Sequence, residues 1–193
     1  MMRAKRSDKQ RVVELLCLSF ADNLSVDFMV GSGSGRDVKI RRLMEYAFEV
    51  CYRSGEILVT EDNSACALLL YPQLKRFSIS SLWLDIKLVF GVIGFSRLLK
   101  VLRREKMINM QHPHQPFCYL WFIGVDPALQ GKGMGSGLLA ALLAKMDAQD
   151  LPVYLETSAG RNISFYQKFG FQVFHQIDLG YSLFFLKRYA SSL

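Results

Sequence analysis

The sequence predicts a mixed α/β fold, in which a central mixed sheet of about six to seven strands is flanked by helices. Three observations lead to this prediction. Short apolar segments rich in β-branched and aromatic residues recur along the chain, and segments with apolar residues at helical spacing separate them. Residues 117–157 read strand, loop, helix, strand, an order that makes the two strands parallel neighbours. The other strands follow one another closely, as antiparallel hairpins do.

Length and composition predict one domain that spans residues 1–193. A chain of this length can bury a sizeable core. Its 51% of hydrophobic and 21% of charged residues are typical of globular proteins.

The first half of the chain predicts helices around one hairpin. Ser7 and Asp8 suit the start of the first helix. The stretch "ADNLSVDFMVGSGSG" predicts a loop, and "EILVTEDNSACALLLYP" predicts a hairpin with an Asp-Asn turn. The predicted elements are a helix ending near residue 21, a helix over 36–53, a hairpin over 56–72, and a helical segment over 81–107 in two pieces around Gly91 and Gly94.

The second half predicts the parallel unit and a closing hairpin. The first parallel strand is expected over 117–125, with Trp121 and Phe122 on opposite sides of the sheet. A glycine-rich loop, a helix over 136–148, a strand over 152–157, a short helix over 162–169, and strands over 171–177 and 182–188 follow.

Charge and cysteine usage limit the classes of function. The net charge of +7 lies mostly in the first half, which favours anionic ligands, nucleic acid or membrane surfaces. The basic run from Arg97 to Lys106 is nevertheless expected to be a solvated helix face, and no nucleic-acid-binding motif is recognisable. Four scattered cysteines predict no metal site and a reducing, cytoplasmic location. Charges interrupt the longest apolar stretch, residues 82–102, which argues against a membrane span.

The stretch "VDPALQGKGMGSGLL" places a glycine at every second position from 131 to 137, between a predicted strand and a predicted helix. The spacing matches neither a P-loop nor a dinucleotide-binding fingerprint. Bare backbone still lets a ligand approach closely, and a helix N-terminus offers free N–H groups and the positive end of a dipole. The loop is therefore predicted to bind phosphate groups through a motif that is neither a P-loop nor a dinucleotide-binding fingerprint.

A second group of candidate functional residues lies in "LETSAGRNISFYQKFGF", residues 155–171. Asn162 is predicted to cap a short helix, and Tyr166 lies one turn later near the same face. Gly170 stands where a C-terminal capping glycine belongs. A phenol aimed at the crevice between the two parallel strands would be a proton donor with an ordinary pKa of about 10.

Together these motifs resemble the GNAT superfamily of N-acetyltransferases, and in particular its puromycin-type subgroup. The family's acetyl-CoA loop reads Gln/Arg-x-x-Gly-x-Gly/Ala, and Gln130, Gly133 and Gly135 match it after a strand that ends in "GVDP". "HPHQPFCYLWFIGV" and "LETSAGRNISFYQKFGF" resemble the same subgroup, so the resemblance covers residues 112–188. In the first half only the order of elements fits, with "MRAK" as a very short first strand.

The resemblance implies that acetyl-CoA binds as co-substrate and that no metal takes part. Strand residues are implied to hold the pantetheine arm and the acetyl carbonyl, and loop N–H groups the pyrophosphate. Gln130 is implied to steady the loop, Asn162 to contact the pantetheine, and Tyr166 to protonate the departing thiolate. The residues implied to bind the co-substrate are Ile123, Gly124, Val125, Gln130, Gly131, Lys132, Gly133, Met134, Gly135, Ser136 and Asn162.

The group that takes a proton from the acceptor amine is left open. Glu156 at the end of a strand, His112 and His114 are the alternatives for a base. Glu156 equally suits a structural anchor for the loop before Asn162, and each histidine suits a plain loop residue. Cys118 is expected to be a packing residue.

The expected function is transfer of an acetyl group to the primary amine of a small molecule by direct attack, with Tyr166 as general acid and Glu156 as the second catalytic residue. The alternatives are transfer to a protein N-terminus or lysine, and a non-catalytic acyl-CoA-binding regulatory module. The expected partner is the small-molecule amine, with neither nucleic acid nor membrane, and a homodimer is left open.

Overall fold

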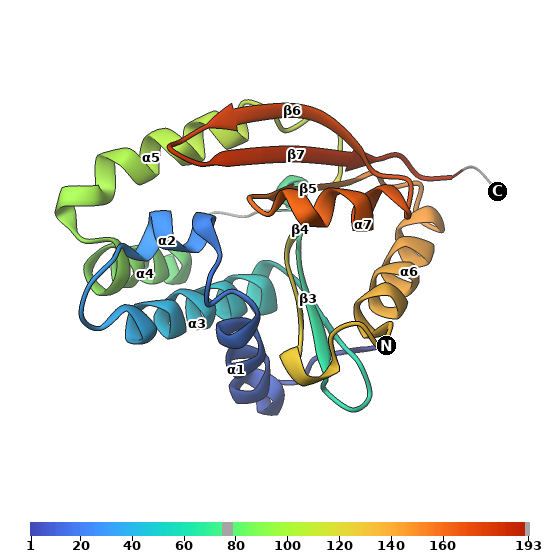
Figure 1. The fold of residues 1–193 in the computed structure, drawn as a ribbon, viewed down its shortest axis with the longest axis horizontal. Coiled ribbons are helices and arrows are strands. Elements are labelled where there is room, and N and C mark those ends of the chain that lie inside the picture. Colours follow the sequence, from blue (N-terminus) through green and yellow to red (C-terminus); the bar gives the residue numbers. More distant parts are fainter. Residues whose placement is uncertain (75–78, 192–193) are drawn as a thin grey trace.

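A computed structural model describes residues 1–74 and 79–191, and Figure 1 shows a central sheet surrounded by helices. The sheet has seven strands in the order β1-β2-β3-β4-β5-β7-β6. The strands are β1 (Met2–Arg3), β2 (Gly55–Val59), β3 (Ala65–Leu70), β4 (Cys118–Val125), β5 (Val153–Thr157), β6 (Gln172–Asp178) and β7 (Ser182–Arg188). Only the β4–β5 pair is parallel among the pairs of described strands. The predicted mixed sheet is therefore confirmed.

The helices also follow the predicted order closely. The α-helices are α1 (Lys9–Ser19), α2 (Leu24–Val30), α3 (Arg36–Ser54), α4 (Ile79–Leu88), α5 (Phe95–Asn109), α6 (Met134–Asp147) and α7 (Ile163–Gln167). A π-helical turn, η3 (Val89–Ile93), joins α4 to α5, and short 3-10 turns are η1 (Arg6–Asp8), η2 (Pro72–Leu74), η4 (Pro127–Leu129) and η5 (Gly160–Asn162). None of the helices within the described ranges is long and apolar enough to cross a membrane.

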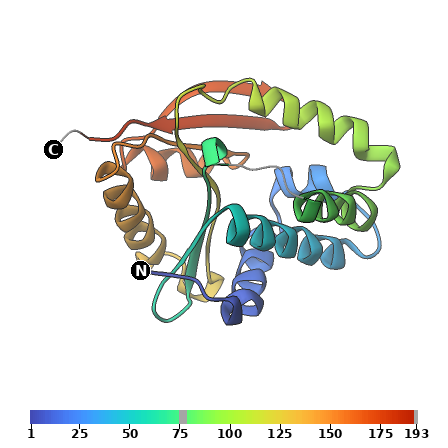
Figure 2. The same ribbon diagram turned by 180° about the vertical axis from the view of Figure 1, so that it is seen from behind.

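Helices cover both faces of the sheet, because successive strand residues point to opposite sides. Ile57 and Leu68 belong to a core that α1, α2 and α3 complete. Their chain neighbours Leu58 and Leu69 belong to a second core, on the face that α6 covers. Helix α5 lies along the β6–β7 hairpin in both views (Figures 1 and 2), where Ile108 packs with strand residues in a third cluster.

The prediction of a loop over residues 21–35 was wrong, because α2 lies within it. The side chain of Asn23 caps this helix by accepting from the backbone N–H groups of Ser25 and Val26, at 3.0 and 3.1 Å. Asparagine is among the best N-cap residues, and this cap was legible in the sequence before the apolar residues of α2. The glycines that suggested a loop follow the helix instead.

A bulge in β4 overturns the expectation for Trp121 and Phe122. Leu68 of β3 opposes Phe122, whereas Leu69 opposes Leu120, so Trp121 is an extra residue in the strand. Both aromatic side chains consequently pack against the core formed by α1 to α3, with ring centroids 5.2 Å apart. A bulge bends its strand and increases the local twist, which here turns the second half of β4 away from β5.

Candidate active site

The strands β4 and β5 diverge and leave one side of β4 open. Their register pairs only residues 118 and 119 with 153 and 154. The N–H of Asp126 donates to the carbonyl of Ser64 at 2.8 Å. Together with the register of β3 and β4, this bond shows which residues of β4 direct their peptide groups toward β3. Alternate residues of an antiparallel ladder turn their peptide groups outward, so those of Ile123 and Val125 face the gap on the β5 side.

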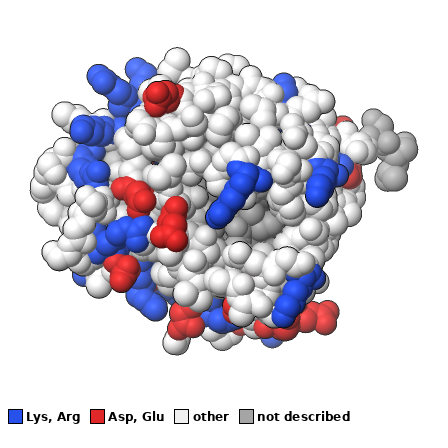
Figure 3. Space-filling view, in the orientation of Figure 1, with Lys and Arg blue, Asp and Glu red and all other residues white. Residues whose placement is uncertain are grey.

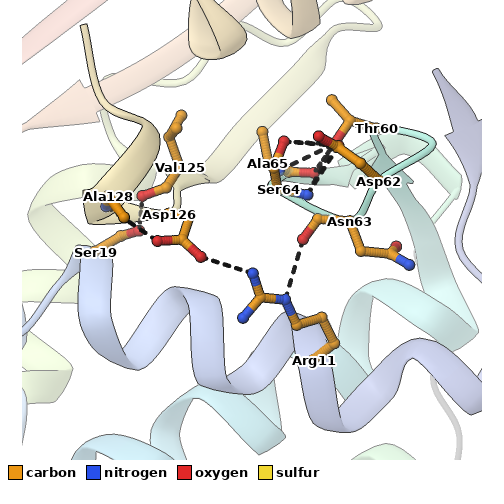
Figure 4. A network of polar contacts seen from close by, with 10 residues as sticks. All are labelled: Arg11, Ser19, Thr60, Asp62, Asn63, Ser64, Ala65, Val125, Asp126 and Ala128. Atoms are coloured by element: carbon orange, nitrogen blue, oxygen red, sulfur yellow. Dashed lines mark hydrogen bonds and ion pairs between the residues drawn. The ribbon is translucent and has the colours of Figure 1, made fainter. Parts of the chain in front are cut away.

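Helix α1 fixes the point where β4 ends and the glycine loop begins (Figure 4). The guanidinium of Arg11 lies 2.7 Å from the carboxylate of Asp126, and the hydroxyl of Ser19 donates to the carbonyl of Val125 at 3.0 Å. Asp126 also accepts from the N–H of Ala128 and so caps the 3-10 turn η4. A Cβ on Gly124 would lie 2.8 Å from the side chain of Leu15, so only glycine lets α1 pack this closely.

The glycine loop leads into α6 with open backbone. Gly131 and Gly133 have φ angles of 78° and 83°, in the left-handed region that glycine adopts without strain. A Cβ at either position would have no heavy atom within 4 Å, so space remains for a ligand to approach. The first N–H groups of a helix have no intrahelical partner. Gly133, the N-cap of α6, has no side chain that could accept from them, so they remain available to a ligand.

The backbone N–H groups that are predicted to bind phosphate are not all available to a ligand. The N–H of Lys132 donates to the carbonyl of Leu129 at 3.3 Å, inside the loop. The side chains of Gln130 and Lys132 are exposed. The first turn of α6, with Met134, Gly135 and Ser136, therefore offers the freer donors.

Basic side chains border this part of the surface. Figure 3 shows a hollow to the right of the centre, where Figure 1 places the gap between β4, α6 and α7, and Lys and Arg side chains lie around it. A positive rim adds attraction for an anionic ligand to that of the helix N-terminus.

A cavity of about 850 Å³ lies at the β4–β5 gap, and four of the predicted site residues line it. These four residues are Ile123, Glu156, Asn162 and Tyr166. Most of the remaining lining is apolar and comes from α2 to α5 and from the strands. The structure thus brings the predicted acid, one predicted base and the open side of β4 to a single space.

Tyr166 is held by aromatic packing. Its side chain is 6% exposed, and its ring lies 5.2 Å from that of Phe165 and 5.6 Å from that of Phe171. Burial raises the pKa of Tyr166 above its ordinary value, so the phenol keeps its proton at neutral pH. Asn162 stands at the N-cap of α7, but its side chain makes no capping bond, contrary to the prediction. The amide lines the cavity instead.

Glu156 is held by two partners that also line the cavity. Its Oε1 lies 3.0 Å from Nε2 of His112, and its Oε2 accepts from the hydroxyl of Tyr119. Burial and the nearby carboxylate raise the pKa of Tyr119 well above its ordinary value, so it remains a donor. Of the two predicted histidines, only His112 reaches this group, and His114 is exposed.

Two further residues of the site, Tyr119 and Arg104, do not lie where the sequence pattern predicts site residues. The guanidinium of Arg104 donates to the hydroxyls of Tyr181 and Ser25 and lines the cavity, and its side chain is only 11% exposed. Within the basic run it was expected to be solvated. Its spacing to Val101 and Ile108, which are buried on the same helix, is the signal that would have placed it inward.

Cys118 is a packing residue, as predicted. Its side chain is fully buried in the core that α6 covers, and burial raises the pKa of its thiol to about 12.

Comparison with known proteins identifies the class. Residues 78–171 match the acetyltransferase (GNAT) family. The chain is 32% identical over 182 residues to a protein of Schizosaccharomyces pombe named as an uncharacterised N-acetyltransferase, and the match covers 88% of this chain and 72% of that protein. The fold and these matches define an N-acetyltransferase that acts on an amine. The chain belongs to the GNAT family.

Solved structures share the fold over nearly the whole chain. A structure from Corynebacterium glutamicum, described as histone acetyltransferase HPA2 and related acetyltransferase, has a TM-score of 0.69 at 20% identity and covers 100% of this chain and 96% of its own. Arylalkylamine N-acetyltransferase 2 from Aedes aegypti has a TM-score of 0.64 at 13% identity and covers 98% of each chain. At these identities the likeness concerns the fold alone. The puromycin-type subgroup stays a prediction.

Proposed function

We propose that the chain acts as a single acetyltransferase domain that moves the acetyl group of acetyl-CoA to the primary amine of a small molecule with an apolar body. The observation that carries this proposal is the cavity at the β4–β5 gap, which Tyr166, Asn162, Glu156 and Ile123 line together. An acid, a carboxylate and outward peptide groups at one space are the parts that direct acyl transfer needs.

Acetyl-CoA fits the open side of β4 and the start of α6. The positive φ angles and open surroundings of Gly131 and Gly133 let the backbone approach a pyrophosphate, and the free N–H groups at the start of α6 suit its charge. The outward peptide group of Ile123 and the outward N–H of Val125 suit the pantetheine arm and the acetyl carbonyl, whereas the carbonyl of Val125 accepts from Ser19. Asn162, free of a capping role, suits a contact with the same arm.

The transfer proceeds by direct attack. The neutral amine nitrogen forms a bond to the acetyl carbonyl carbon, and an outward N–H of β4 donates to the oxygen as it gains charge. The C–S bond then breaks, and Tyr166 gives its proton to the sulfur. Glu156 takes the proton that the amine loses, directly or through water.

The lining of the cavity supports an apolar acceptor of small-molecule size. Its volume of about 850 Å³ falls within the usual range for small-molecule sites. Apolar side chains such as Leu84, Leu88 and Leu98 form much of the wall, and Glu156 is placed to attract the charged form of an amine. An apolar body with one primary amine matches this arrangement better than a strongly polar acceptor does.

A panel of amines tests the proposal by release of free CoA. Arylalkyl and alkyl amines are expected to be acetylated with higher kcat/KM than polyamines, amino acids or peptide N-termini. The Tyr166→Phe variant serves as the matched control for enzyme-dependent release. Preferential acetylation of a peptide N-terminus or a lysine side chain would replace this proposal by the protein-directed alternative.

A further inference from the structure

The outer surface of α4, η3 and α5 exposes a large number of apolar side chains. We call this set the outer face. Its members are Leu82, Trp83, Ile86, Phe90, Phe95, Leu99 and Leu102, which are between 39% and 80% exposed; Leu102 lies where this face meets the edge of the cavity and also lines the cavity. Contiguous apolar surface of this extent on a folded domain marks an interaction site.

The outer face is continuous across the two helices. Trp83, Ile86 and Phe90 follow one another at helical spacing, as do Phe95, Leu99 and Leu102 on α5. The rings of Phe90 and Phe95 meet edge to face with centroids 5.1 Å apart, and this contact joins the two stripes.

The opposite side of the same helices is apolar as well. Val92, Ile93, Val101 and Ile108 are at most 5% exposed and belong to the interior. A helix that is apolar on both sides is normally covered on both. Nothing in residues 1–74 and 79–191 is packed over the outer face, although its composition calls for a partner.

The charges around the outer face are mainly positive. Basic side chains on these helices are Lys87, Lys100, Arg103 and Lys106, besides the inward Arg104 and Arg97, whose guanidinium lies against Gly31 at the end of α2. The acidic residues of the same segment are Asp85 and Glu105. Both are engaged, since Asp85 accepts from the hydroxyl of Tyr46 and Glu105 pairs with Arg104. Figure 3 shows Lys and Arg side chains gathered at the upper left, where Figure 1 places α5.

We propose that the outer face binds the surface of an anionic lipid bilayer. Aromatic and leucine side chains on one side of a helix, with Lys and Arg beside them, are the arrangement that lies in the membrane interface. The apolar side chains enter the level of the headgroups, and the cations pair with lipid phosphates and carboxylates. A second copy of the chain fits less well, because a symmetric interface through this face would bring like charges together.

This inference departs from the expectation that the chain has no membrane partner. From the sequence, the basic run of α5 suited a solvated face. In the folded chain the same turns also present Leu99 and Leu102 to the exterior, at 80% and 54% exposure. A solvated face accounts for the basic side chains but not for the exposed leucines beside them.

Flotation with lipid vesicles tests the proposal without any substrate. The wild type is expected to float with vesicles of phosphatidylcholine and phosphatidylserine, and the bound fraction should fall as NaCl is added. Vesicles of phosphatidylcholine alone should bind much less. The variant Lys100→Gln/Arg103→Gln should lower the partition coefficient about 25-fold, which is about fivefold for each charge removed.

A second variant tests the apolar contribution. Phe95→Gln/Leu99→Gln should abolish flotation while its melting temperature stays close to that of the wild type, since both side chains are exposed. Leu18→Gln is the matched control, because Leu18 is 55% exposed on α1, and it should bind vesicles as the wild type does.

Three outcomes would overturn the proposal. The first is absence of flotation with phosphatidylserine vesicles at low salt, which would point to an acidic protein as the partner. The second is equal binding of the Leu18 control and the Phe95/Leu99 variant. The third is a stable dimer in sedimentation that Phe95→Gln/Leu99→Gln dissociates, which would assign the outer face to a second copy.

Discussion

Nε2 of His112 lies 3.0 Å from Oε1 of Glu156, and the hydroxyl of Tyr119 donates to the other oxygen of the same carboxylate. The side chains of Glu156 and His112 are only 7% and 12% exposed. The carboxylate is thereby fixed in orientation at the wall of the cavity. The same geometry serves a base that takes a proton and an anchor that only positions β5, and mutation separates the two roles.

Glu156→Gln is expected to lower kcat by about 10²–10⁴-fold, because the amide keeps the shape of the side chain but accepts no proton. The KM for acetyl-CoA should change little, since the glycine loop lies elsewhere. Steady-state kinetics with the best amine measures both. Tyr119→Phe is the comparison, and it should cost less because it removes one hydrogen bond and keeps the carboxylate. If Glu156→Gln lowers the melting temperature and leaves kcat near that of the wild type, Glu156 is an anchor.

Tyr166→Phe is expected to lower kcat by about 10²–10⁴-fold with little change in acetyl-CoA binding, because it deletes the proposed acid and keeps the ring. Burial raises the pKa of Tyr166, so deprotonation of this residue should not reduce the wild-type rate below about pH 10. The pH profile of kcat for both proteins measures this. A falling limb near neutral pH that the Phe variant retains, or a variant within a few-fold of the wild type, would assign the proton transfer to another group.

The sequence was sufficient for features that depend on local pattern. The glycine loop before α6 and the strand order of the parallel pair follow from spacing, and the structure places them as expected. The break in the helical segment is likewise where glycine predicts it, at Gly94 with a φ of 73°. Each of these is decided by a few consecutive residues.

Features that depend on long-range packing were not legible in the same way. The bulge at Trp121 arises from register against β3, more than 50 residues away in sequence, so alternation alone placed its side chain wrongly. The bonds from His112 and Tyr119 to Glu156 join segments that meet only after folding. Arg104 was counted with the solvated charges because composition does not show which side of a helix faces a cavity.

Gly133→Ala and Gly137→Ala form a matched pair for the phosphate loop. Gly133 has a φ of 83°, where an alanine side chain is strained by about 1–2 kcal/mol. Gly137 lies inside α6 with open space around it, so alanine there should stabilise the fold by up to about 1 kcal/mol. Denaturant unfolding measures both free energies. Equal effects of the two substitutions would contradict the left-handed role of Gly133.

Acetyl-CoA should raise the melting temperature of the wild type, because ligand at 100 times its Kd adds about 2.7 kcal/mol. Gly133→Val should remove this shift, since its side chain would occupy the space that the ligand needs. Thermal unfolding of both proteins with acetyl-CoA, and in the same buffer without it, measures the difference. A wild type that does not respond to millimolar acetyl-CoA would contradict the site.

A carboxylate far from the cavity should make stability depend on acid pH. Glu49 is 6% exposed and accepts from Arg6 at 2.8 Å and from Lys9 at 2.7 Å. Burial by itself raises the pKa of Glu49, but the hydrogen bonds and charges of Arg6 and Lys9 outweigh it and hold the pKa below its ordinary value. Because the pKa is lower in the folded chain, the stabilisation is present above the unfolded value, about 4.3, and is lost as the pH falls through the folded value.

Glu49→Gln is therefore expected to lower the free energy of unfolding by about 1.5–3 kcal/mol at neutral pH, where the wild type has charge-assisted hydrogen bonds. The difference between variant and wild type should shrink as the pH falls below about 4, because the wild-type carboxyl group then becomes neutral too. Urea unfolding across this pH range measures both proteins. Glu61→Gln is the control, since Glu61 is exposed in the β2–β3 turn and should change stability little at any pH. A difference between Glu49→Gln and the wild type that is the same at every pH would show that packing, and not charge, accounts for the contribution of Glu49.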